Sequence, residues 1–169
     1  MLSILKFEHR TSRSLEDMIL YLADKSKTTE DGLFGIGCNP SYVVLEMEFV
    51  QRIFSQEQLV HPYVQVIFAF DVGISLPLLL LRNIAIEIGQ ALISDKRQVF
   101  GAIHYLDKPD KVHCHYLINY VSVDGALYRQ NYSLWHYKTK VNEILGLYNL
   151  NPIRIFTGDN YWFPITKTA

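Results

Sequence analysis

The chain has 169 residues, of which 49% are apolar and 20% are charged, and its formal net charge at pH 7 is −1. A chain of this length usually forms one domain, and its apolar fraction is high enough for a packed core, which excludes a disordered protein. The near-neutral charge argues against a protein that is basic throughout. A surface that binds nucleic acid would therefore need its basic side chains gathered on one face.

The two cysteines and the apolar runs indicate a reduced compartment and no membrane span. Cys38 and Cys114 form no CxxC pair and give no disulfide framework. The longest apolar run lies around residues 76–81, is interrupted by Pro77 and is followed by Arg82. The N-terminal residues place apolar side chains before basic ones, which is not the order of a signal peptide. A cytoplasmic location is therefore the expectation.

Apolar periodicity, capping residues and turn residues predict an α+β domain with a mainly antiparallel central sheet flanked by helices. Ser14, Pro40 and Ser75 are suitable residues to begin the first three helices. In chain order the expected elements are a strand over 2–8, a helix over 14–23, a polar loop over 24–31, a glycine-rich segment and possible strand over 32–38, a helix over 40–55, a strand over 63–70, a helix over 76–94, strands over 98–106 and 111–121, and a helix over 132–147.

Three histidines are predicted to converge on the last hairpin. His113 and His115 are two residues apart in one expected strand, so their side chains project from the same face. If the turn spans residues 107–110, His104 lies directly opposite His113, and opposed residues share a face with Cβ atoms about 4.5–5.5 Å apart. Three imidazoles suit a divalent transition metal and leave coordination positions open for a substrate.

The other histidines stand alone in the sequence. We interpret His9, His61 and His136 as surface or packing residues, because a single histidine without a second ligand nearby is rarely part of a metal site. Cys114 lies between the two histidines of the strand and is expected to face the opposite side, toward covering helices.

The histidine hairpin and the elements around it resemble the relaxase and mobilisation nucleases of conjugative plasmids and transposons, within the broader His-hydrophobe-His endonucleases. The matching elements in this chain are Tyr21-Leu22 with Lys27-Thr28, Gly35-Ile36-Gly37-Cys38, His104 with Asp107, His113-Cys114-His115, Asn119, Val121-Ser122, and Asp124-Gly125 with Tyr128-Arg129-Gln130-Asn131. The resemblance covers about residues 15–151. Residues 1–150 are therefore interpreted as the nuclease-like domain, and residues 151–169 as a C-terminal extension that fits the start of a further region.

The resemblance implies a relaxase-like fold and transesterification on single-stranded DNA at an origin of transfer. Tyr21 would attack the scissile phosphate, leaving a 5′-phosphotyrosine and a free 3′-hydroxyl. The three histidines would hold a divalent metal ion, with Mn²⁺ or Mg²⁺ as the expected identity. A neutral phenol is a weak nucleophile, so a nearby cation that stabilises negative charge on the phosphate suits this chemistry.

Further site residues and partners follow from the same resemblance. The candidate DNA contacts are Lys25, Lys27, Arg129 and Asn131, because basic and amide side chains bind phosphates and bases. Asp107 and Asp24 would orient a ligand or accept a proton, with turn formation and solvation as an equal alternative explanation of both carboxylates. The implied partners are single-stranded origin DNA and accessory mobilisation proteins, in the bacterial cytoplasm and without a membrane.

Two departures from the family pattern keep an alternative open. In the strand before the third helix relatives carry a His and then Gln-Ser-Phe, whereas this chain has Gln65-Val-Ile-Phe68-Ala69-Phe70, and the proline after the tyrosine motif is absent. A catalytically degenerate relative would bind origin DNA without forming a covalent adduct. An unrelated His-x-His metalloenzyme of the cupin type would need many short strands and few helices.

Overall fold

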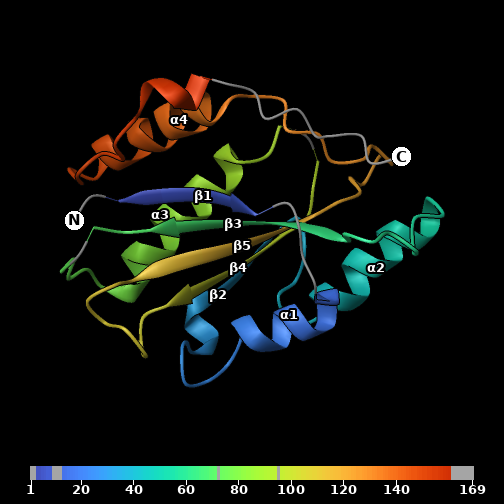
Figure 1. The fold of residues 1–169 in the computed structure, drawn as a ribbon. Helices are drawn as coiled ribbons and strands as arrows, with labels where there is room; N and C mark the ends of the chain where they lie inside the picture. The colour runs from blue at the N-terminus through green and yellow to red at the C-terminus, as the bar shows by residue number, and fades with distance from the viewer. Residues whose placement is uncertain (1–2, 9–12, 72, 95, 161–169) are drawn as a thin grey trace.

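A five-stranded sheet forms the centre of the protein (Figure 1). The computed structural model describes residues 3–8, 13–71, 73–94 and 96–160. The strands are β1 (Ile4–Glu8), β2 (Leu33–Ile36), β3 (Tyr63–Ala69), β4 (Val99–His104) and β5 (His113–Asn119). Their order across the sheet is β1-β3-β5-β4-β2, and each neighbouring pair is antiparallel. The predicted α+β fold with an antiparallel sheet is thereby confirmed.

Helices cover both faces of this sheet (Figure 1). The α-helices are α1 (Leu15–Leu22), α2 (Val43–Ile53), α3 (Leu78–Ala91) and α4 (Leu134–Leu147), and two short 3₁₀ helices span Glu30–Gly32 and Thr157–Asn160. Side chains of α3 and α4 pack in one apolar cluster with alternate strand residues such as Tyr116, and those of α1 and α2 pack with their neighbours such as Leu117. Adjacent residues of β5 thus serve opposite layers. A cupin-type architecture does not fit these four helices.

The first helix begins at its predicted capping serine, whereas the second and third begin later than predicted. The Ser14 side chain accepts a hydrogen bond from the backbone N–H of Asp17 at 3.1 Å, as predicted for the first helix. The third helix was predicted to start near Ser75, but α3 starts after Pro77, whose extended backbone (ψ 140°) precedes the first helical turn. The second helix likewise starts later than predicted, because residues 40–42 form a turn in which Asn39 Oδ1 accepts from the backbone N–H of Ser41.

The possible strand in residues 32–38 is present as β2, at the edge of the sheet beside β4. Phe34 lies directly across from Gly101, and a Cβ atom at Gly101 would lie 2.0 Å from the Phe34 ring. Only glycine therefore allows the ring to lie flat against β4. This close pairing holds the segment between α1 and β2 next to the end of β4, where the histidines lie.

Residues that follow α4 pack back onto that helix. Asn142 exchanges two hydrogen bonds with the backbone of Ile153, and Ile153 is buried in the core. Lys138 and Asp159 form an ion pair at 2.8 Å with both side chains largely buried. The expected domain limit at residue 150 stays a prediction, but Ile153 and Asp159 are both buried against α4.

One earlier expectation, the interpretation of His9 as a surface or packing residue, lies outside the described residues. Within the described part of the chain, no helix is both long enough and apolar enough to cross a bilayer.

Candidate active site

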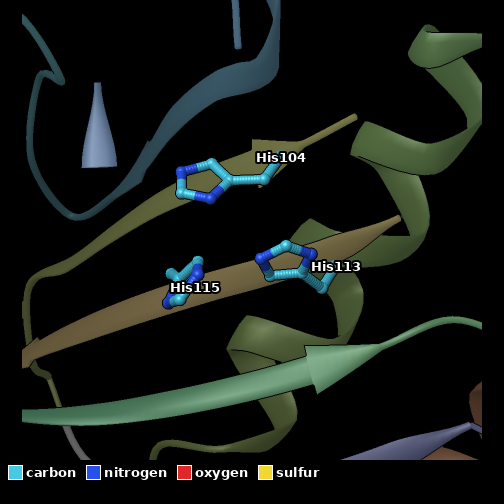
Figure 2. Close-up of side chains that lie close together, drawn as sticks. All are labelled: His104, His113 and His115. Carbon is cyan, nitrogen blue, oxygen red and sulfur yellow. The ribbon is translucent and has the colours of Figure 1, made fainter. Parts of the chain in front are cut away.

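Three histidines from two neighbouring strands converge on one side of the sheet (Figure 2). His104 on β4 lies directly across from His113 on β5, which confirms the predicted register. The ring centroids are 5.1 Å apart for His104 and His113, 4.6 Å for His104 and His115, and 5.0 Å for His113 and His115. One nitrogen of each ring lies within 4.8 Å of the other two. We call these residues the histidine cluster.

The hairpin that carries the cluster is more open than predicted. The two residue pairs expected between the histidines and the turn are not formed, because the β4–β5 ladder ends at His104 and His113. Instead, the backbone N–H groups of Tyr105 and Leu106 both donate to the carbonyl of Lys27, at 3.0 and 3.1 Å. The connection between α1 and β2 is therefore bound to the hairpin beside the cluster.

Each ring of the cluster has one nitrogen bound by another residue. His104 Nε2 lies 2.8 Å from the carbonyl oxygen of Leu22, and His113 Nδ1 lies 2.9 Å from that of Lys111. A carbonyl oxygen only accepts, so these nitrogens carry the protons, and Nδ1 of His104 and Nε2 of His113 keep free lone pairs. His115 Nδ1 lies 2.9 Å from the side-chain amide of Gln65. Such outer hydrogen bonds orient imidazoles as metal ligands.

Burial keeps two of the imidazoles neutral. Desolvation, followed by the nearby His104 and His113, lowers the pKa of His115 from 6.5 to about 3. Desolvation also lowers the pKa of His104, although its hydrogen bond to Leu22 acts in the opposite direction. Both rings are therefore uncharged at neutral pH, so a cation does not have to displace a second proton from either of them.

Cys114 does not belong to this cluster. Its side chain faces the α3 and α4 layer and is fully buried, as the strand alternation predicts. Burial raises the pKa of its thiol to about 12, so no thiolate forms at neutral pH. The cluster thus offers nitrogen ligands alone.

Tyr21 lies in the last turn of α1, directly before the residue that receives the His104 hydrogen bond. Its side chain is 43% exposed. The guanidinium of Arg13 lies 4.5 Å from its ring centroid and the ammonium of Lys27 lies 3.2 Å from it. Lys27 also donates to the Tyr21 carbonyl at 3.2 Å. An exposed phenol between two cations is a suitable place for a phosphate group.

The other predicted residues on this side take different places. Lys25 is exposed in the loop after α1, and Asp107 is exposed in the hairpin loop. Within the described residues Asp107 makes no hydrogen bond or ion pair, but its charge acts on His104. Asp24 accepts from both the backbone N–H and the hydroxyl of Ser26, and these bonds lower its pKa. Asp24 therefore shapes the turn.

Arg129 and Asn131 lie away from the histidine cluster. The backbone N–H of Tyr128 donates to the carbonyl of Tyr120, just beyond the end of β5 that is opposite to His113. Asn131 donates to the hydroxyl of Ser94, which lies shortly after the C-terminal end of α3. The structure brings Tyr21, Lys27 and the three histidines together, but not these two.

Two residues near the site were not singled out from the sequence. Arg13 belongs to the segment before α1, and no sequence motif or spacing indicates its contact with Tyr21. Gln65 was treated as a departure from the family pattern, yet its amide contacts His115. The β3–β5 register places Gln65 diagonally across from His115, and an antiparallel pairing of those strands would have indicated the contact.

The sheet and its histidines define a nuclease-type domain of the relaxase-like class. A family model described as "Relaxase: MobA/VirD2-like, nuclease domain" matches residues 21–150. The match covers well over half of the chain, so the chain belongs to this relaxase family, whose general activity is DNA nicking for mobilisation. No curated protein gives a significant match.

The histidine cluster fits a divalent cation. It offers three imidazole nitrogens from two adjacent strands, and the hydrogen bonds to the Leu22 and Lys111 carbonyls leave one unprotonated nitrogen on each of His104 and His113. Three ligands leave positions open for a phosphate oxygen.

Proposed function

We propose that this protein nicks and rejoins single-stranded DNA at an origin of transfer, with Tyr21 as the nucleophile and the histidine cluster as the site of Mn²⁺ or Mg²⁺. The observation that supports this most is the contact between α1 and the cluster. Tyr21 precedes Leu22, and the Leu22 carbonyl accepts the hydrogen bond of His104 at 2.8 Å. The same helix end therefore carries the nucleophile and holds one ligand.

The proposed step exchanges one phosphodiester for another. The Tyr21 hydroxyl oxygen forms a bond to the scissile phosphorus while the bond from phosphorus to the 3′ oxygen breaks. The phenol loses its proton, and the 3′ oxygen of the released strand takes one up. Because the phosphorus stays esterified to the enzyme, the free 3′-hydroxyl can attack it in the reverse direction and restore the DNA.

The side chains around Tyr21 suit this exchange. Arg13 and Lys27 lie over its ring and would pair with the non-bridging oxygens of a phosphate that approaches the hydroxyl. A divalent cation held by His104, His113 and His115 would stabilise the negative charge that gathers on the phosphate during the exchange. His104 and His115 are neutral at pH 7, which keeps them available as ligands.

The rest of the DNA would lie along the same side of the molecule. Arg13 also lines a hollow of about 460 Å³ between the start of α1 and the second half of α2. This hollow is lined by Arg52 together with Glu48 and Glu57, so its charges are mixed. We therefore propose that it binds bases next to the scissile phosphate rather than additional phosphates. Lys25 is proposed as a phosphate contact in the loop after α1, while Arg129 and Asn131 are proposed as contacts to more distant DNA. Accessory mobilisation proteins are proposed as further partners.

The test is a denaturing gel with single-stranded oligonucleotides tiled across the DNA that flanks the coding sequence. Each oligonucleotide carries one dye at its 3′ end and a different dye at its 5′ end. With Mn²⁺ present, the 3′ dye should move with the protein and the 5′ dye should appear on a shorter free strand. This asymmetry identifies the 5′-phosphotyrosine, because the phosphate stays with the 3′ fragment.

Variants assign the nucleophile and the metal site. Tyr21→Phe and His113→Ala should each abolish the adduct, whereas Tyr42→Phe, at an exposed tyrosine of the α2 side, should leave it unchanged. An adduct that survives Tyr21→Phe would show that another residue is the nucleophile. If the wild type binds an oligonucleotide but forms no adduct with Mn²⁺ or Mg²⁺, the protein is a DNA-binding relative without nicking activity.

A further inference from the structure

The three imidazoles of the histidine cluster differ in how their protons are fixed. His104 and His113 each face a backbone carbonyl, which accepts only, so each ring is held in one tautomer. His115 faces a side-chain amide instead. An amide has a donating nitrogen and an accepting oxygen, so it satisfies either tautomer of the ring that it faces.

We propose that Gln65 is a positioning residue whose amide turns over when a cation enters, and that it thereby sets the metal affinity of the cluster. With its Nε2 toward His115, as in this structure, the amide donates to Nδ1, and the ring proton sits on the Nε2 of His115. With its oxygen toward the ring, it accepts from Nδ1–H and leaves the imidazole Nε2 with a free lone pair. The inference rests on the proposed function only in taking the cluster as a cation site.

The surroundings of Gln65 leave few other solutions for its amide. Gln65 is 5% exposed and His115 is 8% exposed, so bulk water does not replace either partner freely. Gln65 lies on β3 across from Leu117, so its side chain shares a face with His115, which lies across from Ile67. A buried polar pair that loses its hydrogen bond costs free energy in either state, so the amide follows the ring.

This arrangement has a functional consequence for metal loading. A buried imidazole held rigidly with its proton on the ligand nitrogen would block the third position of the cluster. A rotation of the amide by half a turn about its terminal torsion removes this block without moving the backbone. The chain therefore keeps a satisfied core without metal and a third ligand with metal.

The direct test observes the tautomer of His115 by long-range ¹H–¹⁵N NMR on the full-length wild type, without a variant that could fail to fold. In the metal-free protein the proton should be on Nε2 of His115, and on addition of Zn²⁺, as a diamagnetic divalent probe, it should be on Nδ1. A proton on Nδ1 in both states, or on Nε2 in both, would overturn the proposal.

Metal affinity gives the second readout. Gln65→Met removes the polar contact at similar volume and should weaken Mn²⁺ binding, measured by calorimetry, by about 10- to 100-fold. Gln65→Glu restores an acceptor for Nδ1–H and should bind Mn²⁺ at least as tightly as the wild type. The matched control is Gln90→Met on the exposed side of α3, which should change nothing.

The outcomes separate this inference from the proposed function. If His104→Ala lowers Mn²⁺ affinity but Gln65→Met leaves it unchanged, the positioning role of Gln65 is wrong and the metal site stands. If neither variant changes Mn²⁺ affinity, the histidine cluster is not the cation site, and both proposals fall.

Discussion

Two polar clusters lie on the same face of β5, one at each end of the strand, and they are built in opposite ways. At one end, Asn119 uses both of its amide protons and both acceptor sites of its oxygen. It donates to Gln98 Oε1 and the Met47 carbonyl, and it accepts from Gln51 Nε2 and the backbone N–H of Val121. We call this the asparagine cluster; every group of Asn119 is satisfied within the protein.

At the other end the histidine cluster is only half satisfied. Each ring has one nitrogen bound by a neighbour, and in the described part of the chain no hydrogen bond reaches the second nitrogen of any ring. A closed network fixes how α2 meets the sheet, whereas an open one holds a place for a ligand. The comparison shows how a structural polar residue differs from a candidate ligand in this fold. The hydrogen-bonding groups of the structural residue are all satisfied within the protein, whereas the candidate ligand keeps an atom without a partner among the described residues.

The largest expected effect comes from opening the closed cluster. Asn119→Ala removes a hydrogen-bond partner from buried groups of α2 and of Gln98, and each buried group left unsatisfied costs about 1–3 kcal/mol. The free energy of unfolding should therefore fall by about 3 kcal/mol or more, measured by urea denaturation. Mn²⁺ affinity of the folded fraction should stay within about twofold of the wild type. A loss below about 1 kcal/mol would contradict the structural role of Asn119.

The next effect comes from closing the open cluster with metal. Mn²⁺ at about 100 times its dissociation constant should stabilise the wild type by about 2.7 kcal/mol, because the cation binds the folded state alone. His104→Ala should remove this stabilisation. Asn119→Ala should be less stable than the wild type without metal, but Mn²⁺ should raise its free energy of unfolding by the same amount. Thermal unfolding with and without Mn²⁺ checks both variants. Equal stabilisation of His104→Ala and wild type would place the cation elsewhere.

Acid should act on the histidine cluster through its buried rings. The pKa of His115 is about 3 in the folded protein and 6.5 in an unfolded chain, so between these values the unfolded state binds the extra proton. Stability should fall as the pH drops through this window, by about 2 kcal/mol from His115 at pH 5 relative to pH 7.5. His104, with a pKa shifted in the same direction, adds to the effect.

The measurement is urea denaturation of the metal-free protein at pH 7.5 and pH 5. His115→Gln removes the titrating group at this position. Its free energy of unfolding should therefore fall by about 2 kcal/mol less between pH 7.5 and pH 5 than that of the wild type. The comparison uses the change within each variant, so a different stability at pH 7.5 does not matter. Equal pH dependence in both proteins would show that His115 is not the titrating group.

The smallest expected effect on stability concerns the cations around Tyr21. Arg13→Gln should change the free energy of unfolding by less than about 0.5 kcal/mol, because its contact is near the surface. Its effect should appear in DNA binding, where the slope of log affinity against log salt should become shallower by about 0.7 for single strands. Lys140→Gln, an exposed lysine of α4, serves as the control with the same change of charge. An unchanged slope for Arg13→Gln would remove Arg13 from the phosphate contacts.

The local features of the fold could be predicted from the sequence. The pairing of His104 with His113 followed from the turn length and the two-residue period of a strand, and Ser14 marked the start of α1 through its own side chain. The starts of α2 and α3 were placed too early. Pro40 lies in the turn before α2 rather than in its first helical turn, and the extended residue Pro77, not Ser75, directly precedes α3.

The contacts that depend on distant residues could not be predicted in the same way. The ring of Tyr21 between Arg13 and Lys27 depends on how the loops at both ends of α1 fold back. Gln65 was visible as an unusual residue, but its meaning required the order of the strands, which no local pattern carries. Arg129 and Asn131 matched a motif, and the structure places them beyond the opposite end of β5.

The strand order has a consequence for biosynthesis. The sheet order β1-β3-β5-β4-β2 puts the earliest strands at the two edges and the latest strand in the middle. A chain emerging from the ribosome can pair β1 with β3 and β2 with β4, but these two halves stay separate until β5 arrives between them. His113 and His115 arrive with that strand. A nascent chain therefore completes its histidine cluster, the proposed cation site, in the same event that closes its sheet, and unfinished chains lack the complete cluster.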